Sequence, residues 1–356
     1  MAMSQSKNKF WMVLVILFLA ASGCKSVPTK DLAYSVLFHE KTSDAPTRNL
    51  GFNHDGNRLL SAPGYDAVSL LRSESGEVVN RHEFEDVIAG LEFLDTGEVF
   101  IAKSGGAIEL WDAEISHLIK SHEFEIYKRL ATIRKDGRWG FFGNRLFSWG
   151  DSINLEIDIP IVNERRLFFF DSEYAVAVGA QDSRIVTIDL ATMSQSEWMA
   201  PERLVTGGPR LLSKTLIMIT EDDHIYALDI KNQEVIYDIS FFFSSPKLIV
   251  VPSHGDWFAV MYDSKAVFYD AETGNKQFSL PLDFPWSGVT SSNRGKLFIG
   301  SELGSLYVVD VATQSIAVAK LFDQSAIGPM TWHEETNRLA IGTRKGETMV
   351  IELETK

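Results

Sequence analysis

Cysteine is almost absent from this chain of 356 residues, which contains only Cys24. A single cysteine cannot form a disulfide within the chain, so packing alone must stabilise the fold. A catalytic cysteine needs His partners elsewhere in the fold. Cys24 instead follows directly on an apolar run near the N-terminus, and this position indicates a different role.

Positive charge is also scarce. The chain has 34 Lys and Arg against 48 Asp and Glu, a formal net charge of −14, and no basic run offsets this acidity. A surface of this sign repels the phosphates of nucleic acids and the headgroups of anionic lipids. We therefore expect no nucleic-acid partner.

The sequence lacks the usual motifs of metal and catalytic sites. His-Glu pairs begin at His39, His82, His122 and His333, but none has the second His four residues later that a zinc-binding helix uses. The acidic run 221–224 lacks the alternating ligands and the Gly of a calcium loop. No glycine-rich phosphate loop and no Gly-x-Ser-x-Gly elbow occurs. We expect no metal, no cofactor and no catalytic residue.

The apolar run near the N-terminus is too short to span a bilayer comfortably. It covers residues 10–21 (FWMVLVILFLAA), 12 residues, whereas a transmembrane helix needs about 20. Residues 1–9 carry two Lys and no acid, and Ser-Gly-Cys follows the run at 22–24. This order is typical of a secretory signal. We predict a signal peptide over residues 1–23; a buried helix or an uncleaved anchor is the alternative.

Residues 21–24, Ala-Ser-Gly-Cys, resemble the lipobox of bacterial lipoproteins, with Ala21 where Leu is commonest. The resemblance implies a diacylglycerol on the Cys24 sulfur, cleavage before Cys24 and acylation of the new amine. Acyl chains contribute about 0.8 kcal/mol per buried CH₂, enough together to hold a domain on a membrane. By resemblance to the Gram-negative sorting rule, Lys25 in place of Asp favours the outer membrane, facing the periplasm. Residues 24–31 would form a short lipid-anchored tether.

The rest of the chain repeats at intervals near 40 residues. His-Glu-Phe-Glu at 82–85 recurs at 122–125. Strand-like runs that end in an acid or a turn residue recur with it. Eight of them align at Arg72, Asp112, Trp149, Asp189, Asp229, Asp270, Asp310 and Glu352. Turn signals such as Asp-Gly precede a second set of apolar strands. Units of four short strands joined by tight turns are typical of propeller blades.

We therefore predict an all-β fold, a single eight-bladed β-propeller over residues 32–356 with four-stranded antiparallel blades; seven blades are the alternative. The last unit, 323–356, supplies only three strands, while the segment 32–41 (LAYSVLFHEK) is a strand without a blade. As the outer strand of blade eight, 32–41 would close the ring and remove an exposed sheet edge. An irregular β-sandwich predicts neither an extra strand at the N-terminal end of the repeats nor a missing strand at their C-terminal end.

Two repeat families resemble these units. Ile108–Asp112 (IELWD) resembles the Trp-Asp ending of WD repeats, and Phe268–Gly274 (FYDAETG) resembles the Ala-x-Asp-x-x-Thr-Gly signature of quinoprotein-like repeats. The Asp and Thr-Gly of that signature shape a hairpin and are structural. A quinone-dependent dehydrogenase would also need a calcium site, a catalytic Asp and typically adjacent cysteines. Eight units behind a lipobox are similar in architecture to the propeller lipoprotein of the outer-membrane β-barrel assembly machinery.

The links from an outer strand to the next inner strand lie on one face of a propeller, beside its central channel. Exposed aromatic side chains in such a link would mark a partner site, and Phe284 and Trp286 fall in one. Trp286 fits the core between blades equally well, and Phe241–Phe243 fit the core better. The acidic turn 221–224 is a contact for a cation or basic partner or, as we favour, a solvated hairpin. The candidate partner-binding residues are Phe284, Trp286, Asp222, Asp223 and Arg184.

From these features we expect a membrane-anchored scaffold without enzymatic activity, a monomer that works within a complex of envelope proteins or peptides. The resemblance suggests a role in outer-membrane protein assembly. The alternative is a propeller enzyme or small-ligand sensor that uses the central channel. A channel enzyme should show converging His, Arg and carboxylates, whereas expected inner strands such as 89–93 and 288–292 are mostly apolar or small. This favours the scaffold.

Overall fold

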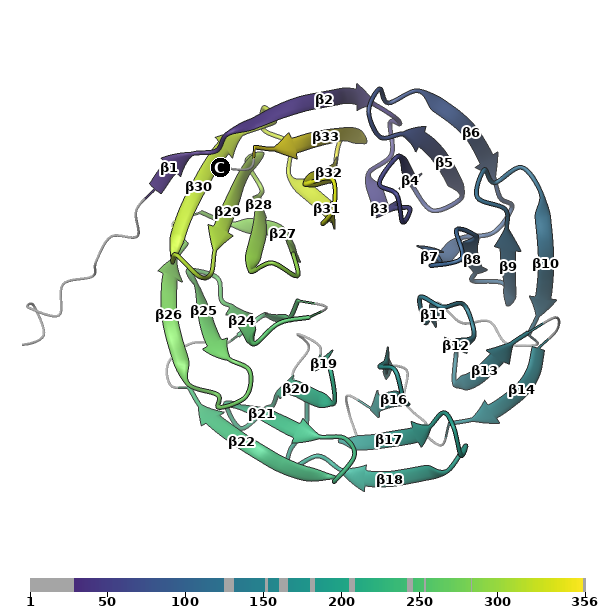
Figure 1. The fold of residues 1–356 in the computed structure, drawn as a ribbon, viewed down its shortest axis with the longest axis vertical. Helices are drawn as coiled ribbons and strands as arrows, with labels where there is room; N and C mark the ends of the chain where they lie inside the picture. The colour runs from purple at the N-terminus through teal and green to yellow at the C-terminus, as the bar shows by residue number, and fades with distance from the viewer. Residues whose placement is uncertain are drawn as a thin grey trace, which may run out of the picture.

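The computed structural model describes residues 29–124, 131–150, 153–159, 166–179, 183–204, 209–241, 246–252, 254–282 and 284–354. In these residues every helix or strand assigned is a β-strand, and the strands form eight antiparallel blades around a central channel (Figure 1). The predicted eight-bladed propeller is confirmed. No helix long and apolar enough to span a bilayer occurs in the described part of the chain.

The strands of each blade follow one another from the channel outward. Blades 1 to 3 contain β3 (Thr47–Phe52), β4 (Arg58–Pro63), β5 (Ala67–Arg72), β6 (Val78–Glu83), β7 (Ile88–Phe93), β8 (Val99–Lys103), β9 (Ala107–Trp111), β10 (Leu118–Glu123), β11 (Ala131–Ile133), β12 (Trp139–Phe142), β13 (Arg145–Trp149) and β14 (Ile153–Asp158). Blades 4 to 6 contain β15 (Arg166–Phe170), β16 (Tyr174–Gly179), β17 (Arg184–Asp189), β18 (Gln195–Met199), β19 (Arg210–Leu212), β20 (Thr215–Ile219), β21 (His224–Asp229), β22 (Glu234–Ser240), β23 (Leu248–Val250), β24 (Trp257–Met261), β25 (Lys265–Asp270) and β26 (Lys276–Pro281). Blades 7 and 8 contain β27 (Trp286–Ser291), β28 (Lys296–Ser301), β29 (Ser305–Asp310), β30 (Ser315–Lys320), β31 (Ile327–His333), β32 (Arg338–Thr343), β33 (Glu347–Leu353) and β2 (Tyr34–Lys41).

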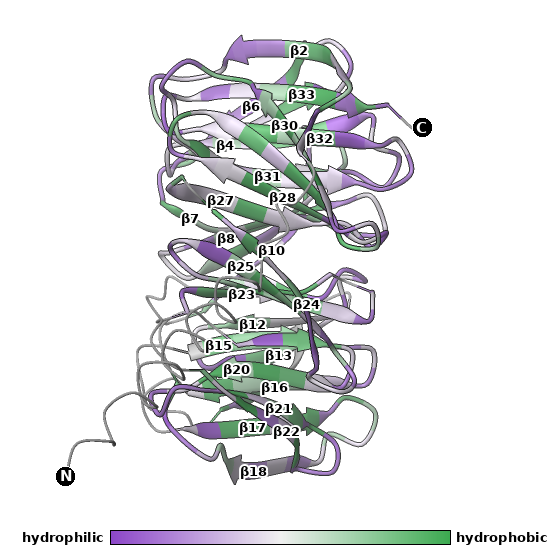
Figure 2. Ribbon diagram, turned by 90° about the vertical axis from the view of Figure 1, so that its left-hand side faces the viewer, coloured by the Kyte–Doolittle hydropathy of each residue, from purple (hydrophilic) through white to green (hydrophobic). Residues whose placement is uncertain are grey.

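The turns lie on two opposite faces of the ring, which Figure 2 shows edge-on. The connector face carries the turns between second and third strands and the links between blades. The hairpin face carries the remaining turns. On the connector face the residue after an outer strand donates its backbone N–H to a turn carbonyl, as Phe84 does to Asp66 and Ala200 to Ser183, both at 2.7 Å. Phe84 and Phe124, from the repeated His-Glu-Phe-Glu, are both buried at this position.

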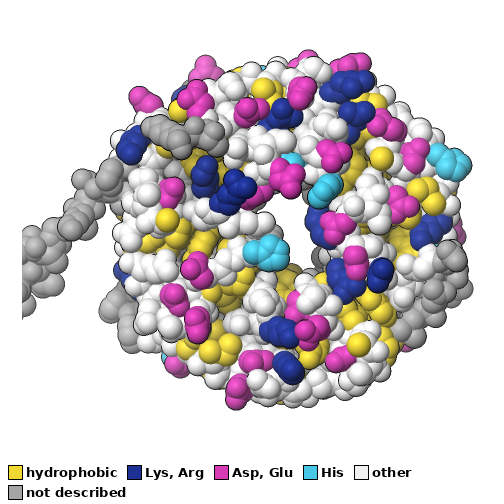
Figure 3. All heavy atoms as spheres, in the orientation of Figure 1, with side chains coloured by type: hydrophobic (Ala, Val, Ile, Leu, Met, Phe, Trp, Pro, Cys, Tyr) yellow, Lys and Arg dark blue, Asp and Glu magenta, His cyan; other side chains and the backbone are white. Residues whose placement is uncertain are grey.

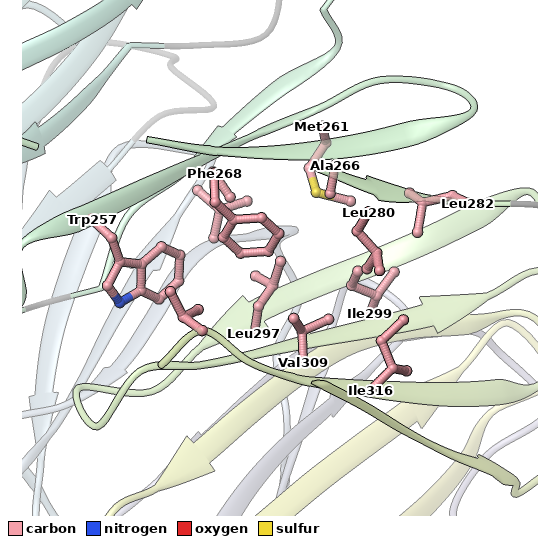
Figure 4. Close-up of a cluster of buried hydrophobic side chains, with 13 residues drawn as sticks. Trp257, Met261, Ala266, Phe268, Leu280, Leu282, Leu297, Ile299, Val309 and Ile316 are labelled. Atoms are coloured by element: carbon pink, nitrogen blue, oxygen red, sulfur yellow. The ribbon is translucent and has the colours of Figure 1, made fainter. Parts of the chain in front are cut away.

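Hydrophobic side chains fill the space between neighbouring blades. Because both sides of a blade are covered, the middle strands are buried along their length, and all six residues of β16 are buried. Between blades 6 and 7, the ring of Phe268 stacks on Phe278 with 4.2 Å between centroids and lies beside Trp257. Figure 4 shows Phe268 facing Leu297 of the next blade. Each blade therefore depends on its neighbours for burial.

The N-terminal strand completes the eighth blade, as predicted. β2 pairs antiparallel with β33, from Tyr34 opposite Leu353 to Lys41 opposite Glu347. Phe38 of β2 is buried in the core between blades 8 and 1. Backbone hydrogen bonds between the two ends of the propeller thus close the ring.

A short strand, β1 (Thr29–Asp31), extends blade 7 and was not expected. It pairs in parallel with the outer strand β30, with Thr29 opposite Ile316, so this sheet has five strands (Figure 1). β1 falls at the end of the segment 24–31 that we predicted to be a tether. Residues 1–28, with Cys24 and the predicted signal peptide, lie outside the described residues.

An aspartate at the end of the third strand caps the next hairpin in several blades. Asp270 accepts hydrogen bonds from the backbone N–H of Thr273 at 2.8 Å and from its hydroxyl at 2.7 Å. Asp189 accepts the same backbone bond from Thr192 at 2.8 Å. These bonds hold the pKa of both carboxyls below its ordinary value. Gly274 follows with a φ of 71°, so the predicted structural role of Asp and Thr-Gly is confirmed.

Gln233 occupies the corresponding left-handed position in blade 5, with a φ of 59°. A residue with a Cβ costs roughly 1 kcal/mol there, which Gly avoids. We expect Gln233→Gly to raise the free energy of unfolding by about 0.5 kcal/mol, measured by urea denaturation. Gly274→Ala is the matched reverse change and should lower it, because its Cβ would lie 2.6 Å from the Tyr237 ring. A loss of stability in Gln233→Gly would contradict the strain argument.

The inner strands of blades 7 and 8 touch each other. The Ser287 hydroxyl donates to the carbonyl of Ile327 at 2.7 Å. A Cβ on Gly288 would lie only 2.2 Å from the carbonyl oxygen of Gly328. The two backbones can approach this closely because Gly288 has no side chain.

Inner strands are shorter in some other blades. The inner strands β11, β19 and β23 of blades 3, 5 and 6 have three residues each, whereas β27 and β31 have six and seven. Pro209 directly precedes β19, and Pro252 lies just beyond β23. Proline has no N–H to donate and does not extend a strand ladder.

Candidate functional site

The five predicted partner-binding residues all lie at the connector face, but in separate places. Arg184 begins β17 of blade 4 and forms an ion pair with Glu197 at 3.4 Å. Asp222 and Asp223 lie in the turn before β21 of blade 5. Phe284 precedes β27 and Trp286 begins it, at the boundary of blades 6 and 7. The fold therefore distributes these residues over several blades.

The two aromatic candidates pack between blades. Phe284 stacks on Tyr307, with 3.7 Å between centroids and 7° between planes. Trp286 donates its indole N–H to the carbonyl of Tyr262 at 2.9 Å. Both side chains are partly buried against the core between blades 6 and 7. Phe241 is buried between blades 5 and 6, as expected for core packing, while Phe242 and Phe243 lie outside the described residues.

The acidic turn of blade 5 is held by its own hydrogen bonds. Asp222 accepts from the hydroxyl of Thr220 at 2.5 Å and from the phenol of Tyr226 at 3.1 Å. Burial raises the pKa of Tyr226, and the hydrogen bond from its phenol to Asp222 raises this pKa further. Asp223 takes a φ of 64°, where the matching turn of blade 7 has Gly304. The local geometry is that of a hairpin turn.

A patch on blade 1 combines the side chains expected at a protein interface. The guanidinium of Arg48 lies over the ring of Tyr65, 4.5 Å from its centroid. Tyr65 is 53% exposed and Val87 is 43% exposed. The Ile88 N–H donates to the Tyr65 carbonyl, which places Val87 beside Tyr65. We call Arg48, Tyr65 and Val87 the blade-1 patch.

The second feature is a hollow in the channel, which Figure 3 shows open through the ring with charged and His side chains around its mouth. It consists of two cavities of about 680 and 550 Å³ on blades 2 to 6. We call them together the channel hollow. Both cavities are lined by Phe170, Asp171, Ser172 and His254. Apolar lining comes from blades 4 to 6, including Leu211, Val251 and Pro252.

Most charged side chains at the mouth of the hollow are paired. Arg134 donates to Asp136, with 2.9 Å between Nε and Oδ1, and Lys135 pairs with Glu92. Burial acts to raise the pKa of Asp136, but hydrogen bonds from Arg134 and from the backbone of Arg138 bring it below its ordinary value. The Lys135–Glu92 pair joins blades 3 and 2, whereas the Arg134–Asp136 pair lies within one turn of blade 3.

Arg210 differs from the other cations of the channel. It lines a third cavity of about 180 Å³, whose lining shares Val251 with that of the channel hollow. Its guanidinium donates to the carbonyl of Pro209 at 2.9 Å. Within the described part of the chain no carboxylate pairs with it. Burial among Leu248, Val289 and their neighbours lowers the pKa of the guanidinium.

The hollow offers binding chemistry. The imidazole of His254 makes no hydrogen bond to Ser172 or Ser213 among the described residues, although all three line the same cavity. In the described part of the chain no three His, Cys, Asp or Glu side chains gather as a metal-ligand group. The hollow therefore supplies an apolar wall, and Arg210 supplies a positive charge in the third cavity.

Comparisons with known proteins give a likeness of fold. No family model and no curated protein sequence matches the chain. BamB from Moraxella catarrhalis is 16% identical with a TM-score of 0.65, and the match covers 90% of this chain and 100% of BamB. Sqt1 from Saccharomyces cerevisiae is 12% identical with a TM-score of 0.72, covering 92% and 100%. The computationally designed Ika8 protein is 13% identical with a TM-score of 0.66, also covering 92% and 100%. These neighbours support the β-propeller fold.

Proposed function

We propose that the protein is a lipid-anchored, non-enzymatic scaffold of the bacterial cell envelope that binds other proteins through its connector face. The blade-1 patch carries this proposal. Tyr and Arg are the residue types that most often dominate the energy of protein interfaces, and they do so next to apolar neighbours. The stacked Arg48 limits the freedom of the exposed Tyr65 ring, so less entropy is lost on binding.

The proposed location of the scaffold in the cell rests on the N-terminal sequence. The lipobox-like residues before Cys24 support lipid attachment, and Lys25 supports the outer membrane, facing the periplasm. The likeness to BamB is one of fold. A role in outer-membrane protein assembly, as a monomer within a larger complex, rests on the resemblance of eight units behind a lipobox to the propeller lipoprotein of that assembly machinery. WD-like and quinoprotein-like repeats remain our description of the blades at Trp111 and Asp270.

Photo-crosslinking in intact cells tests the partner site. We expect a benzoylphenylalanine at position 65 to form a discrete adduct with a specific protein, and Arg48→Ala to reduce that adduct several-fold. Position 78 is the matched control, because Val78 is 54% exposed on the outer strand of the same blade. Equal adducts from positions 65 and 78 would contradict a partner site on the connector face.

Lipidation is tested by Cys24→Ala. We expect the variant to take up no labelled palmitate and to leave the membrane fraction, because Cys24 is the one thiol of the chain. Ser22→Ala keeps a small residue in the lipobox and should be lipidated like the wild type. Palmitate uptake by Cys24→Ala would show that the lipobox prediction is wrong.

A small-ligand role is the second candidate function. The observation that favours it is the channel hollow together with Arg210 in the third cavity, which shares Val251 with it. Ligand binding there is compatible with a scaffold, because the hollow and the blade-1 patch lie on different elements of the ring.

A further inference from the structure

The channel hollow has an apolar wall on one side and paired charges on the other. Phe170, Leu211 and Val251 supply apolar surface from blades 4, 5 and 6. Asp171 accepts the backbone N–H groups of Glu173 and Tyr174 in its own turn, both at 2.6 Å. The cavities, at about 550 and 680 Å³, fall within the range of small-molecule and peptide sites.

Among the Arg and Lys residues that line the three cavities, Arg210 is the one without a carboxylate partner in the described part of the chain. Arg210 lines the third cavity together with Leu248–Val250 and Val289. Transfer of a charge into such surroundings is costly unless a partner compensates it. The hydrogen bond to the Pro209 carbonyl uses one of the five N–H donors of the Arg210 guanidinium. The remaining donors can therefore receive a ligand.

The charge balance defines the class of ligand. Arg134 and Lys135 are already paired with Asp136 and Glu92, so of the described Arg and Lys residues that line the three cavities, Arg210 remains to balance a bound anion. One guanidinium matches one carboxylate, which it can hold by two parallel hydrogen bonds. A phosphate dianion would need a second cation. The apolar wall next to Arg210 then suits a hydrocarbon or aromatic group attached to the carboxylate.

We propose that the channel binds an apolar monocarboxylate, with its carboxylate on Arg210 and its apolar group on the wall of the hollow. Two sources share this chemistry: a free carboxylic acid, and the C-terminal carboxylate of a polypeptide with an apolar last residue. The site lies beyond the proposed scaffold function and does not depend on Cys24. A failure of lipidation therefore leaves this proposal intact.

Calorimetry on the full-length protein in a neutral maltoside detergent tests the proposal. The probes are N-acetyl-Leu-Phe with a free carboxylate, the same dipeptide as its amide, and hexanoate. We expect at least one carboxylate probe to bind and the amide to bind about tenfold to a hundredfold more weakly, because it lacks the charge-assisted bonds. A preference for the dipeptide assigns the site to a polypeptide C-terminus, and equal or tighter hexanoate binding assigns it to free acids.

Arg210→Gln should weaken carboxylate binding to the level of the amide. Arg294→Gln is the control, since Arg294 is 67% exposed near the same face and pairs with Glu334. Arg210→Leu gives an independent readout: it should raise the melting temperature of the free protein, because an unpaired charge leaves the apolar channel. The proposal is overturned if neither carboxylate binds, if binding survives Arg210→Gln, or if Arg210→Leu lowers the melting temperature.

Discussion

A chain shortened to begin at Thr42 is expected not to reach the folded state. The deletion removes β2, so β33 loses its antiparallel partner from Tyr34 to Lys41 and the ring is no longer closed by backbone hydrogen bonds. It also removes Phe38, which is 7% exposed between blades 8 and 1. Loss of one buried Phe side chain alone costs about 3–5 kcal/mol, a large share of the stability of a typical domain.

Circular dichroism during heating and size-exclusion chromatography measure this result. We expect the shortened chain to aggregate or to lack a cooperative transition. A chain that begins at Leu32 is the matched control, since it lacks β1 but keeps β2. It should fold, with a loss of no more than about 2 kcal/mol from the few backbone hydrogen bonds of a three-residue strand. Equal melting temperatures for the two chains would contradict closure by β2.

The blade count and the closing strand could be predicted because the blades share a pattern of burial, and several share a hairpin cap. The middle strands are buried on both sides and read as apolar runs, and aspartates such as Asp270 cap the hairpin after the third strand. β1 gives no such signal. Three residues carry no periodicity, and their pairing with Ile316 joins segments almost 300 positions apart.

The candidate sites were harder to predict than the fold. The orientation of the Trp286 side chain could not be predicted from sequence, because an aromatic residue in a link can point outward or pack between blades. The hydrogen bond from its indole N–H to the Tyr262 carbonyl shows that it packs between blades. Pro-Gly-Tyr-Asp signals a turn at Tyr65, but its contact with Arg48 depends on the register of β3 against β4. Arg210 reads as an ordinary strand residue until its neighbours across the channel are known.

A large effect of a single substitution is expected at Gly288, where the inner strands of blades 7 and 8 touch. The Cβ of Gly288→Ala would lie 2.2 Å from the Gly328 oxygen and 3.2 Å from the Ile327 oxygen. Both obstacles are backbone atoms, which cannot rotate away, so blade 8 would have to shift relative to blade 7. Ser287, which bonds the Ile327 carbonyl, would lose its geometry with that shift.

We expect Gly288→Ala to lower the free energy of unfolding by about 3 kcal/mol, the upper end of the cost of overpacking a core. Gly51→Ala is the matched control, because Gly51 also lies on an inner strand but its Cβ would meet nothing within 4 Å. That change should be neutral or slightly stabilising, since alanine restricts the unfolded chain. Urea denaturation of both variants separates the two cases. If Gly288→Ala matches Gly51→Ala, the inner strands of blades 7 and 8 do not touch in solution.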